Sequence, residues 1–392
     1  MKEHNNSLQL RISRELELLD STQSARSLER SYGRYGKYCW VGSSTLLNLS
    51  GNDYLGLSER EDLRRAFLSL YPDYAVPHGS TSSRLLLGNY SLASTFEREI
   101  AQALKQETAL LFNSGYHANT AILPALSSLE GVHILADKLV HASIIDGIRL
   151  SQASFERFRH NDFNHLERLL SRLESAKIPI VVVESLYSMD GDITNLKALV
   201  ALKKRFPELI LYVDEAHAIG AIGSNGYGVA EEQGVLQEID ILVGTFGKAL
   251  NSMGAYVATS TLLKRFLINK ARPLIFSTML PEATIAWSRF LFNLLPSFTV
   301  ERAQLRALSS WVHSGIASSE YRTCGDSYIV PLLLGSNEAC YQMALRMQSA
   351  GFEVRPIRYP TVPKGEARIR LSLTASMTEK DLLPLIDLLR NR

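Results

Sequence analysis

The 392-residue sequence predicts an α/β fold, with a mostly parallel central sheet in a large domain and a smaller α+β domain at the C-terminus. Two observations carry this prediction. Short apolar runs typical of buried strands recur through the middle of the chain, at residues 109–112, 133–136, 178–183, 209–213 and 241–243. Amphipathic stretches at 163–175 and 196–205 separate some of these runs, so helices are expected to cover both faces of the sheet.

The two ends of the chain follow other patterns. Residues 8–30 are polar with leucines at near-helical spacing and predict an amphipathic helix, whereas residues 38–50 predict a short hairpin with a Gly-Ser turn. After Pro281 the pattern predicts helices at 283–295, 300–314, 337–349 and 378–389, and strands at 328–334 and 369–373. We therefore expect an N-terminal helical segment at 1–40, a large domain at 41–285 and a small domain at 286–392.

The composition excludes several classes of protein. The net charge of +2 gives no reason to expect nucleic acid or an acidic membrane as a partner. Three widely spaced cysteines, Cys39, Cys324 and Cys340, indicate reduced thiols, and no metal site is expected. The N-terminus lacks an apolar signal core, and no run reaches the ~18 apolar residues of a membrane helix, so a cytoplasmic protein is expected.

The most informative segment is a turn of small residues that ends in Lys248 and directly follows the apolar run 241–243. A lysine held on a rigid turn beside a core strand is poorly solvated. Desolvation lowers the pKa of the amine, which then acts as a nucleophile and can form a Schiff base. The alternative is an ordinary surface lysine, which is the more common situation.

Asp214 and His217 follow the predicted strand 209–213. Polar residues at the carboxyl ends of the strands in an open α/β sheet are expected to form the ligand site. An aspartate placed directly after a buried strand needs a positive partner, and a pyridinium nitrogen would serve. A helix N-cap is an equal alternative for Asp214, and His217 could be an ordinary satisfied polar residue.

Three more strand ends carry weaker signals. The Ser114-Gly115 pair opens a helical stretch, where free backbone N–H groups and the helix dipole favour a phosphate. His141 could lie flat against an aromatic ligand or cap a helix. The segment 184–192 is rich in turn formers and acceptors, and an ordinary loop with Asx turns explains it equally well.

A nucleotide-binding loop is excluded at Lys248. The motif G-x-x-x-x-G-K-[ST] requires a glycine at position 242, which is Leu242, and Ser or Thr at position 249, which is Ala249. The sequence also has no G-x-G-x-x-G after a strand, so a dinucleotide fold is unsupported.

Taken together and in this order, the motifs resemble the fold-type I pyridoxal-phosphate enzymes and, more narrowly, the α-oxoamine synthase family. The resemblance runs from about Asn52 to about Ala375. It rests on Ser114-Gly115-Tyr116, His141-Ala142-Ser143, Ser188-Met189-Asp190-Gly191-Asp192, Asp214-Glu215-Ala216-His217, Thr245-Phe246-Gly247-Lys248 and Phe276-Ser277-Thr278. The C-terminal segment 360–371 is most similar to the members of the biotin pathway.

The resemblance implies roles for the residues around the cofactor, pyridoxal 5'-phosphate. Lys248 would hold the cofactor as a Schiff base, Asp214 would pair with the ring nitrogen, His217 would bind the ring hydroxyl and His141 would stack on the ring. These four are the expected catalytic residues. The phosphate would bind Ser114, Gly115, Tyr116 and Thr245, and Ser188 would complete the pocket. Ser277 and Thr278 would reach the phosphate of a neighbouring subunit, which implies a homodimer.

The resemblance also implies the substrates. Arg370 would clamp the carboxylate of the amino acid, and Thr361 and His141 would contact substrate. Arg26 stands at about the spacing of an N-terminal substrate-contacting arginine, with Arg30 as a rival. The expected reaction is a decarboxylative condensation of L-alanine with pimeloyl-CoA or a pimeloyl carrier protein.

Two alternatives to this reaction stay open. One is a sibling synthase that joins glycine or serine to a different acyl-CoA, because the acyl pocket cannot be identified from one sequence. The other is a non-catalytic subunit, which the presence of Lys248 and its partners disfavours. Two departures from the family pattern, Thr81-Ser82 in place of a glycine pair and Ala93 in place of a histidine, lie away from Lys248 in the sequence.

Overall fold

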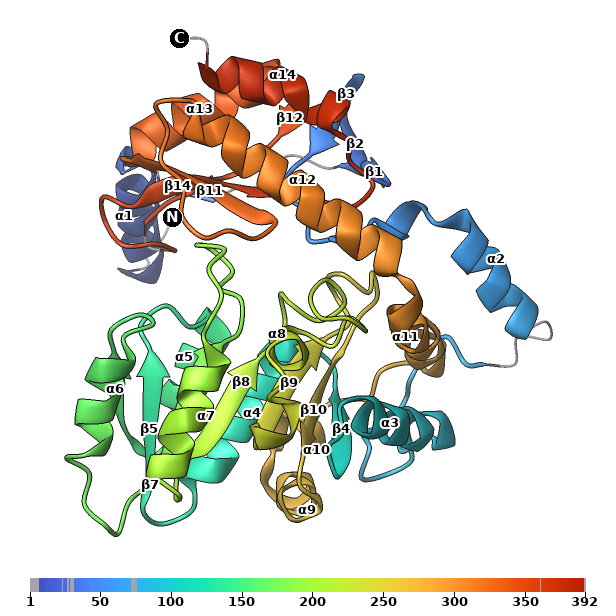
Figure 1. The fold of residues 1–392 in the computed structure, drawn as a ribbon, viewed down its shortest axis with the longest axis vertical. Coiled ribbons are helices and arrows are strands. Elements are labelled where there is room, and N and C mark those ends of the chain that lie inside the picture. The colour runs from blue at the N-terminus through green and yellow to red at the C-terminus, as the bar shows by residue number, and fades with distance from the viewer. Residues whose placement is uncertain are drawn as a thin grey trace, which may run out of the picture. The chain divides into compact units, whose positions relative to one another are not determined.

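The computed structural model describes residues 7–22, 24–26, 28, 32–71, 76–359 and 361–390. The chain forms two compact units (Figure 1). The larger unit comprises residues 53–188 and 192–305, and the other comprises 1–52, 189–191 and 306–392. The predicted domain ranges 1–40, 41–285 and 286–392 stay a prediction.

The larger unit is built on a seven-stranded sheet with the order β4-β10-β9-β8-β7-β5-β6. Six strands are parallel, and β10 runs antiparallel to both of its neighbours. The strands are β4 (Thr108–Phe112), β5 (Val132–Asp137), β6 (Ser154–Phe158), β7 (Ile178–Glu184), β8 (Ile210–Asp214), β9 (Ile241–Thr245) and β10 (Ala255–Thr259). The predicted fold class is thereby confirmed.

Helices cover the faces of this sheet (Figure 1). Helices α4 and α5 pack on each other, and α4 also contacts α9, α10 and the central strands. The helices of the larger unit are α2 (Glu61–Leu70), α3 (Ser91–Ala103), α4 (Gly115–Ser127), α5 (Ala142–Leu150), α6 (Phe163–Leu170), α7 (Leu196–Arg205), α8 (Val229–Glu232), α9 (Thr261–Lys270), α10 (Arg272–Ile275) and α11 (Glu282–Leu294), with 3₁₀ turns η1 (Leu57–Glu59), η2 (Leu236–Glu238) and η3 (Leu295–Ser297). Helix α12 (Thr299–Ala317) continues past residue 305.

The core on the α4 side of the sheet takes every second strand residue, because side chains alternate between the faces of a strand. Ile180 and Val182 of β7 and Tyr212 of β8 belong to this core. By the same period of two, Glu184 and Asp214 at the ends of these strands point to the α4 side. The strand pattern therefore brings two carboxyl groups to one edge of the sheet, where Glu184 and Asp214 are register partners.

The other unit contains two small sheets, with the orders β1-β2-β3-β12 and β11-β14-β13. Its elements are α1 (Ser7–Ser21), β1 (Gly33–Tyr35), β2 (Tyr38–Val41), β3 (Ser44–Asn48), β11 (Ile329–Gly335), α13 (Asn337–Ser349), β12 (Phe352–Glu353), β13 (Pro356–Ile357), β14 (Ala367–Ser372) and α14 (Glu379–Arg390). The predicted hairpin at 38–50 is confirmed as β2 and β3, with Gly42 at φ 59° in the turn.

Two sequence predictions needed correction. The N-terminal helix ends at Ser21 and does not extend through the described residues toward position 30. The hydroxyl groups of Ser21 and Thr22 donate to the carbonyl of Leu18 at 2.9 and 2.8 Å and so compete with continued helix formation. The strand β6 was not predicted, because four of its five residues are exposed and no apolar run marks it.

Candidate active site

The Asp214 carboxylate is the buried centre of the candidate site, with 5% of the residue exposed. Its Oδ2 accepts a hydrogen bond from Asn119 Nδ2 at 2.9 Å, and its Oδ1 accepts one from the Ala216 backbone N–H at 2.9 Å. Both donors are neutral. Because neither donor brings a positive charge, a cationic ligand group would be a favourable further partner for this buried carboxyl group.

A chain of neutral hydrogen bonds connects Asp214 to His141. Asn119 Nδ2 also donates to Ser143 Oγ at 2.9 Å, and that hydroxyl lies 2.8 Å from His141 Nδ1. The Ser143 backbone N–H donates to the same ring nitrogen at 3.2 Å, so His141 Nδ1 is an acceptor and the ring is neutral. The loss of water around the ring is the main cause that lowers the pKa of His141. The Asp214 carboxylate opposes this shift and the Lys248 cation reinforces it.

Glu184 brings a second buried carboxyl group to the same strand ends, with 3% of the residue exposed. Its Oε1 has no hydrogen-bond partner among the described residues, and its carboxyl group also accepts from the His141 backbone N–H. Burial raises the pKa of Glu184 well above its usual range, and the neighbouring Asp214 charge adds to this effect. Burial and the neighbouring Asp214 carboxylate therefore both favour the protonated form of Glu184.

His217 lies in the same region, held by a residue far away in the sequence. Its Nδ1 is 2.7 Å from the hydroxyl of Tyr54, and Tyr54 is fully buried. Only 5% of His217 is exposed. The Tyr54 hydroxyl thus restrains the orientation of the His217 ring.

Lys248 lies in a tight turn after β9, and the residue is partly exposed. The Lys248 carbonyl accepts a hydrogen bond from the Asn251 backbone N–H at 2.8 Å, and the Phe246 carbonyl accepts one from the Ser252 backbone N–H at 2.8 Å. Asn251 has φ 44°, a left-handed conformation that Asn tolerates better than most residues. These hydrogen bonds close the turn, and its lysine acts electrostatically on both His141 and Glu184.

The predicted phosphate residues lie at the start of α4. Ser114 caps this helix by accepting the His117 backbone N–H at 3.1 Å. A side chain built at Gly115 would meet nothing within 4 Å, so open space lies beside the first helical residue. The first N–H groups of an α-helix have no partner inside the helix and bind anions readily. The start of α4 can therefore hold a phosphate.

The other predicted cofactor residues, Thr245, Ser188, Ser277 and Thr278, differ in their exposure. Thr245 and Ser188 are buried at 8% and 7% exposure, whereas Ser277 is half-buried and Thr278 is exposed. Thr245 Oγ1 donates to the Gly254 carbonyl at 2.9 Å and accepts from the Gly247 N–H at 3.3 Å. Its hydroxyl thus belongs to the Lys248 turn.

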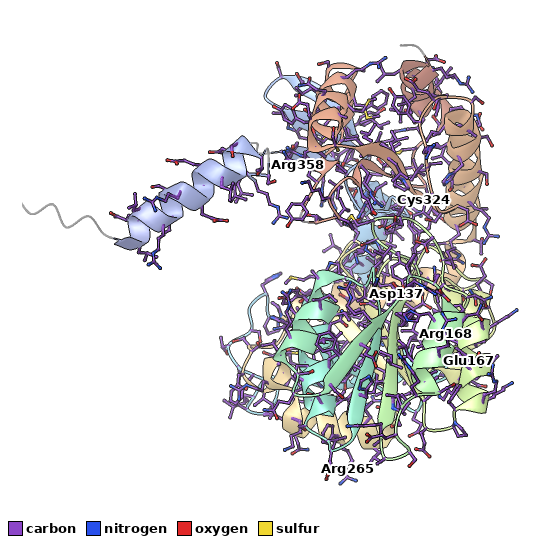
Figure 2. All side chains as sticks on the ribbon, turned by 90° about the vertical axis from the view of Figure 1, so that its left-hand side faces the viewer. Asp137, Glu167, Arg168, Arg265, Cys324 and Arg358 are labelled. Carbon is purple, nitrogen blue, oxygen red and sulfur yellow. The ribbon has the colours of Figure 1, made fainter. Side chains whose placement is uncertain are left out.

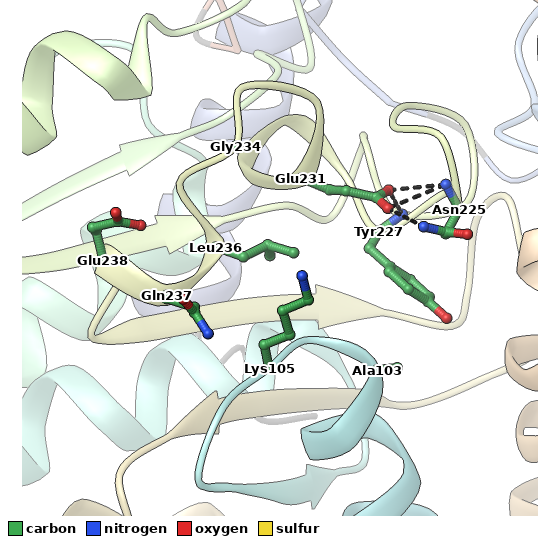
Figure 3. A pocket seen from close by; sticks show the side chains of 9 residues that line it. All are labelled: Ala103, Lys105, Asn225, Tyr227, Glu231, Gly234, Leu236, Gln237 and Glu238. Atoms are coloured by element: carbon green, nitrogen blue, oxygen red, sulfur yellow. Dashed lines mark hydrogen bonds between the residues drawn. The ribbon is translucent and has the colours of Figure 1, made fainter.

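A cavity of about 580 Å³ adjoins these residues. Tyr116, Ser277, Phe276, Lys270 and Arg272 contribute to its lining. A second cavity of about 390 Å³, lined by residues that include Lys105, Tyr227 and Glu231, contains none of the predicted site residues (Figure 3).

Three of the predicted substrate residues, Arg26, Thr361 and Arg370, belong to the smaller unit, whereas His141 belongs to the larger one. Arg370, on β14, donates from Nη2 to Asn52 Oδ1 and, at 2.7 Å, to Ser372 Oγ. Arg26 Nη2 donates to Thr361 Oγ1 at 2.9 Å, so the structure brings these two predicted residues together. Arg30, the rival to Arg26, lies outside the described residues.

Four functional contacts were not predicted: those of Asn119, Tyr54, Glu184 and Asn52. Asn119 follows Gly115 by four positions, which places both residues on the same face of α4. This spacing could have indicated that Asn119 belongs to the site. Tyr54 and Asn52 lie in the segment where the family resemblance begins. No local pattern indicated the partner of either residue.

Three comparisons with known proteins agree on one family. The model of the family "Aminotransferase class I and II" matches residues 44–389. A relative from Haemophilus influenzae, provisionally named 8-amino-7-oxononanoate synthase, is 51% identical over 365 residues, which is 93% of this chain and 96% of the relative. Within the described residues, no helix is long and apolar enough to cross a membrane.

Two solved structures resemble most of the chain. A serine palmitoyltransferase from S. paucimobilis with bound pyridoxal phosphate joined to myriocin has a TM-score of 0.87 and 28% identity, covering 99% of this chain and 98% of that one. An 8-amino-7-oxononanoate synthase from Francisella tularensis has a TM-score of 0.73 and 27% identity, covering 88% of this chain and 97% of that one.

Proposed function

The chain belongs to the class I and II aminotransferase family and, within it, to the 8-amino-7-oxononanoate synthases, and we propose on this premise that it condenses L-alanine with a pimeloyl thioester. The products are 8-amino-7-oxononanoate, CO2 and the free thiol of the carrier. The enzyme depends on pyridoxal 5'-phosphate. The observation that carries the proposal is the buried Asp214 carboxylate, held by neutral donors beside Lys248 and His141.

The residues at the strand ends fit this cofactor. The Asp214 charge suits a protonated ring nitrogen, the start of α4 suits a phosphate, and the Lys248 amine suits covalent attachment. When bound, the cofactor supplies an electron sink that stabilises negative charge on the α-carbon of an amino acid. His217, oriented by Tyr54, would donate toward the ring hydroxyl.

Lys248 is the proposed base that removes the α-proton of alanine. Its position on a rigid turn limits the reorientation that proton transfer would otherwise require. The neutral His141 ring, fixed through Ser143, would lie against the cofactor ring without adding a second positive charge. Once the acyl group has replaced the carboxylate of alanine, with release of CO2 and the carrier thiol, Lys248 would return a proton to the α-carbon.

Arg370 is the proposed ligand for the alanine carboxylate, since a guanidinium binds a carboxylate through two parallel hydrogen bonds. Arg26 and Thr361, which contact each other, are the proposed substrate contacts of the same unit. Ser277 and Thr278 are proposed to reach the cofactor phosphate of a second copy of the chain, which makes the enzyme a homodimer with shared sites.

The test of the catalytic assignment is Lys248→Ala, with Lys204→Ala as its matched control on the exposed face of α7. Lys248→Ala should remove the absorption band that borohydride reduces in the wild type and should lower turnover by on the order of 10⁴-fold or more. Lys204→Ala should change neither quantity. Full turnover by the Lys248→Ala protein would contradict the proposal.

The substrate is tested by thiol release from pimeloyl-CoA and palmitoyl-CoA, each with alanine, glycine and serine. The proposal predicts the highest kcat/KM for pimeloyl-CoA with alanine. The similarity to serine palmitoyltransferase, which covers 99% of this chain, makes serine with a long acyl thioester the second candidate. A higher kcat/KM for that pair would replace the first proposal by the second.

The shared site is tested by mixing two inactive variants, Lys248→Ala and the double variant Ser277→Ala with Thr278→Ala. If the sites are shared, subunit exchange produces mixed dimers with one intact site, and activity returns. Independent sites would leave the mixture inactive.

A further inference from the structure

His160, which the sequence did not indicate as functional, bridges two carboxylates of the larger unit. Its Nδ1 lies 2.9 Å from Asp137 Oδ1 and its Nε2 lies 2.7 Å from Asp192 Oδ2. A neutral imidazole has one N–H and could donate to one carboxylate only, whereas imidazolium donates to both. Burial disfavours the charge, but the hydrogen bonds to Asp137 and Asp192 outweigh it and raise the pKa of His160 to about 10. The ring is therefore an imidazolium at neutral pH.

The Asp137 end of this bridge fixes the segment that leads to His141. Asp137 ends β5 and is fully buried (Figure 2). Its Oδ1 also accepts from the Leu139 N–H at 2.8 Å, and its Oδ2 accepts from the Asn161 N–H at 2.9 Å. These hydrogen bonds define the turn after the strand, and His141 is the N-cap residue of α5 at its end.

The Asp192 end fixes the loop that carries Ser188. The Asp192 carbonyl accepts from the Tyr187 N–H at 3.0 Å, directly before Ser188. The Tyr187 ring meets the His160 ring edge-on, with 4.5 Å between centroids and an angle of 86° between planes. Asn161 Nδ2 donates to the same Asp192 oxygen at 2.6 Å. The position of Asp192 therefore determines where the backbone at Ser188 lies.

Asn161 adds evidence that this arrangement is specific. It has φ 50°, a left-handed conformation that costs free energy for a residue with a side chain. In this conformation its backbone N–H reaches Asp137 while its side chain reaches Asp192. The segment 160–161 thus contacts both carboxylates twice.

We propose that His160 is a positioning residue of the cofactor site, because it ties the turn that leads to His141 to the loop that carries Ser188. Neither Asp137 nor Asp192 needs to touch the cofactor for this effect. The inference rests on the proposed assignment of His141 and Ser188 to the cofactor site. Replacing the imidazolium by a neutral group should let the two segments separate, and the cofactor should bind more weakly.

The experiment is a titration of apoprotein with pyridoxal 5'-phosphate, followed by the intrinsic protein fluorescence. His160→Gln should weaken cofactor binding by roughly 10–100-fold, as expected for the loss of a charged hydrogen-bonded support. His160→Arg should recover most of the affinity, because a guanidinium stays charged and can donate to both carboxylates. A merely structural role would not predict recovery by a larger cation.

The matched control is His133→Gln. His133 lies near the start of β5, at the other end of the same strand pair, with its Nδ1 2.7 Å from Ser154 Oγ. This variant should lose stability without losing cofactor affinity. Wild-type affinity in His160→Gln, or an equal loss in His133→Gln, would overturn the inference.

Three further variants keep the test decisive. If His160→Gln does not fold, Asp192→Asn replaces it, since the amide is isosteric, removes the negative charge and keeps one acceptor oxygen. Ser188→Ala and His141→Asn test the assignment on which the inference rests. If these two leave the affinity unchanged, the assignment fails. If they lower it while the bridge variants do not, the positioning role alone fails.

Discussion

Two buried carboxylates of the larger unit, Asp214 and Asp137, look alike in sequence and differ in their partners. Each ends a parallel strand, and they are 5% and 0% exposed. Asp137 is satisfied inside the protein by the His160 cation and two backbone N–H groups. Within the described part of the chain, the hydrogen-bond donors to Asp214 are the neutral Asn119 amide and the Ala216 backbone N–H. A buried carboxylate that is paired with an internal cation supports the structure, whereas one held by neutral donors keeps its charge for a ligand.

The largest expected effect is on catalysis at Asp214. Asp214→Asn removes the charge that would keep the cofactor nitrogen protonated, and kcat should fall by roughly 10²–10³-fold, as when a preorganised electrostatic contact is removed. An asparagine oxygen can still accept one of the two neutral donors, so the unfolding free energy should change by less than about 1 kcal/mol. Steady-state kinetics and urea denaturation of the apoprotein measure the two effects.

The reverse outcome is expected at Asp137. Asp137→Asn leaves His160 and two backbone N–H groups with a poorer acceptor. The unfolding free energy should fall by about 3 kcal/mol. This value is at the lower end of the range for broken buried ion pairs, because the His160 side chain is 26% exposed. The same denaturation experiment measures this loss. If Asp214→Asn proves as destabilising as Asp137→Asn, the distinction between the two carboxylates is wrong.

The sequence predicted the strand ends that carry the site because strand, turn and polar residue are adjacent in the chain. Lys248, Asp214, His217 and the start of α4 all belong to such local units. Partners that depend on tertiary structure were missed. Asn119 reaches Asp214 across 95 positions, and Tyr54 reaches His217 across 163. The smaller unit combines both ends of the chain, so its composition likewise depends on contacts that no local pattern encodes.

The pH dependence of stability distinguishes the two carboxylates further. The pKa of His160 is about 10 in the folded protein, whereas the ordinary pKa of histidine is 6.5. Its stabilising contribution is therefore complete below pH 6.5 and is lost as the pH rises toward 10. The difference in unfolding free energy between the wild type and His160→Gln should therefore shrink between pH 6.5 and 10. Urea denaturation across this range measures it, and a constant difference would mean that His160 is neutral in the folded state.

The smallest expected effect concerns a neutral contact of the catalytic region, Tyr54 with His217. Tyr54→Phe keeps the buried ring and removes the hydroxyl that lies 2.7 Å from His217 Nδ1. A neutral hydrogen bond contributes about 0.5–1.5 kcal/mol, so cofactor affinity should fall by roughly 2–10-fold, with no loss of the absorption band. The same titration of apoprotein measures it. A much larger loss of cofactor affinity would mean that His217 is charged in the site. The neutral surroundings inferred for Asp214 would then be wrong, because the His217 imidazolium would supply the cation that we assign to the cofactor.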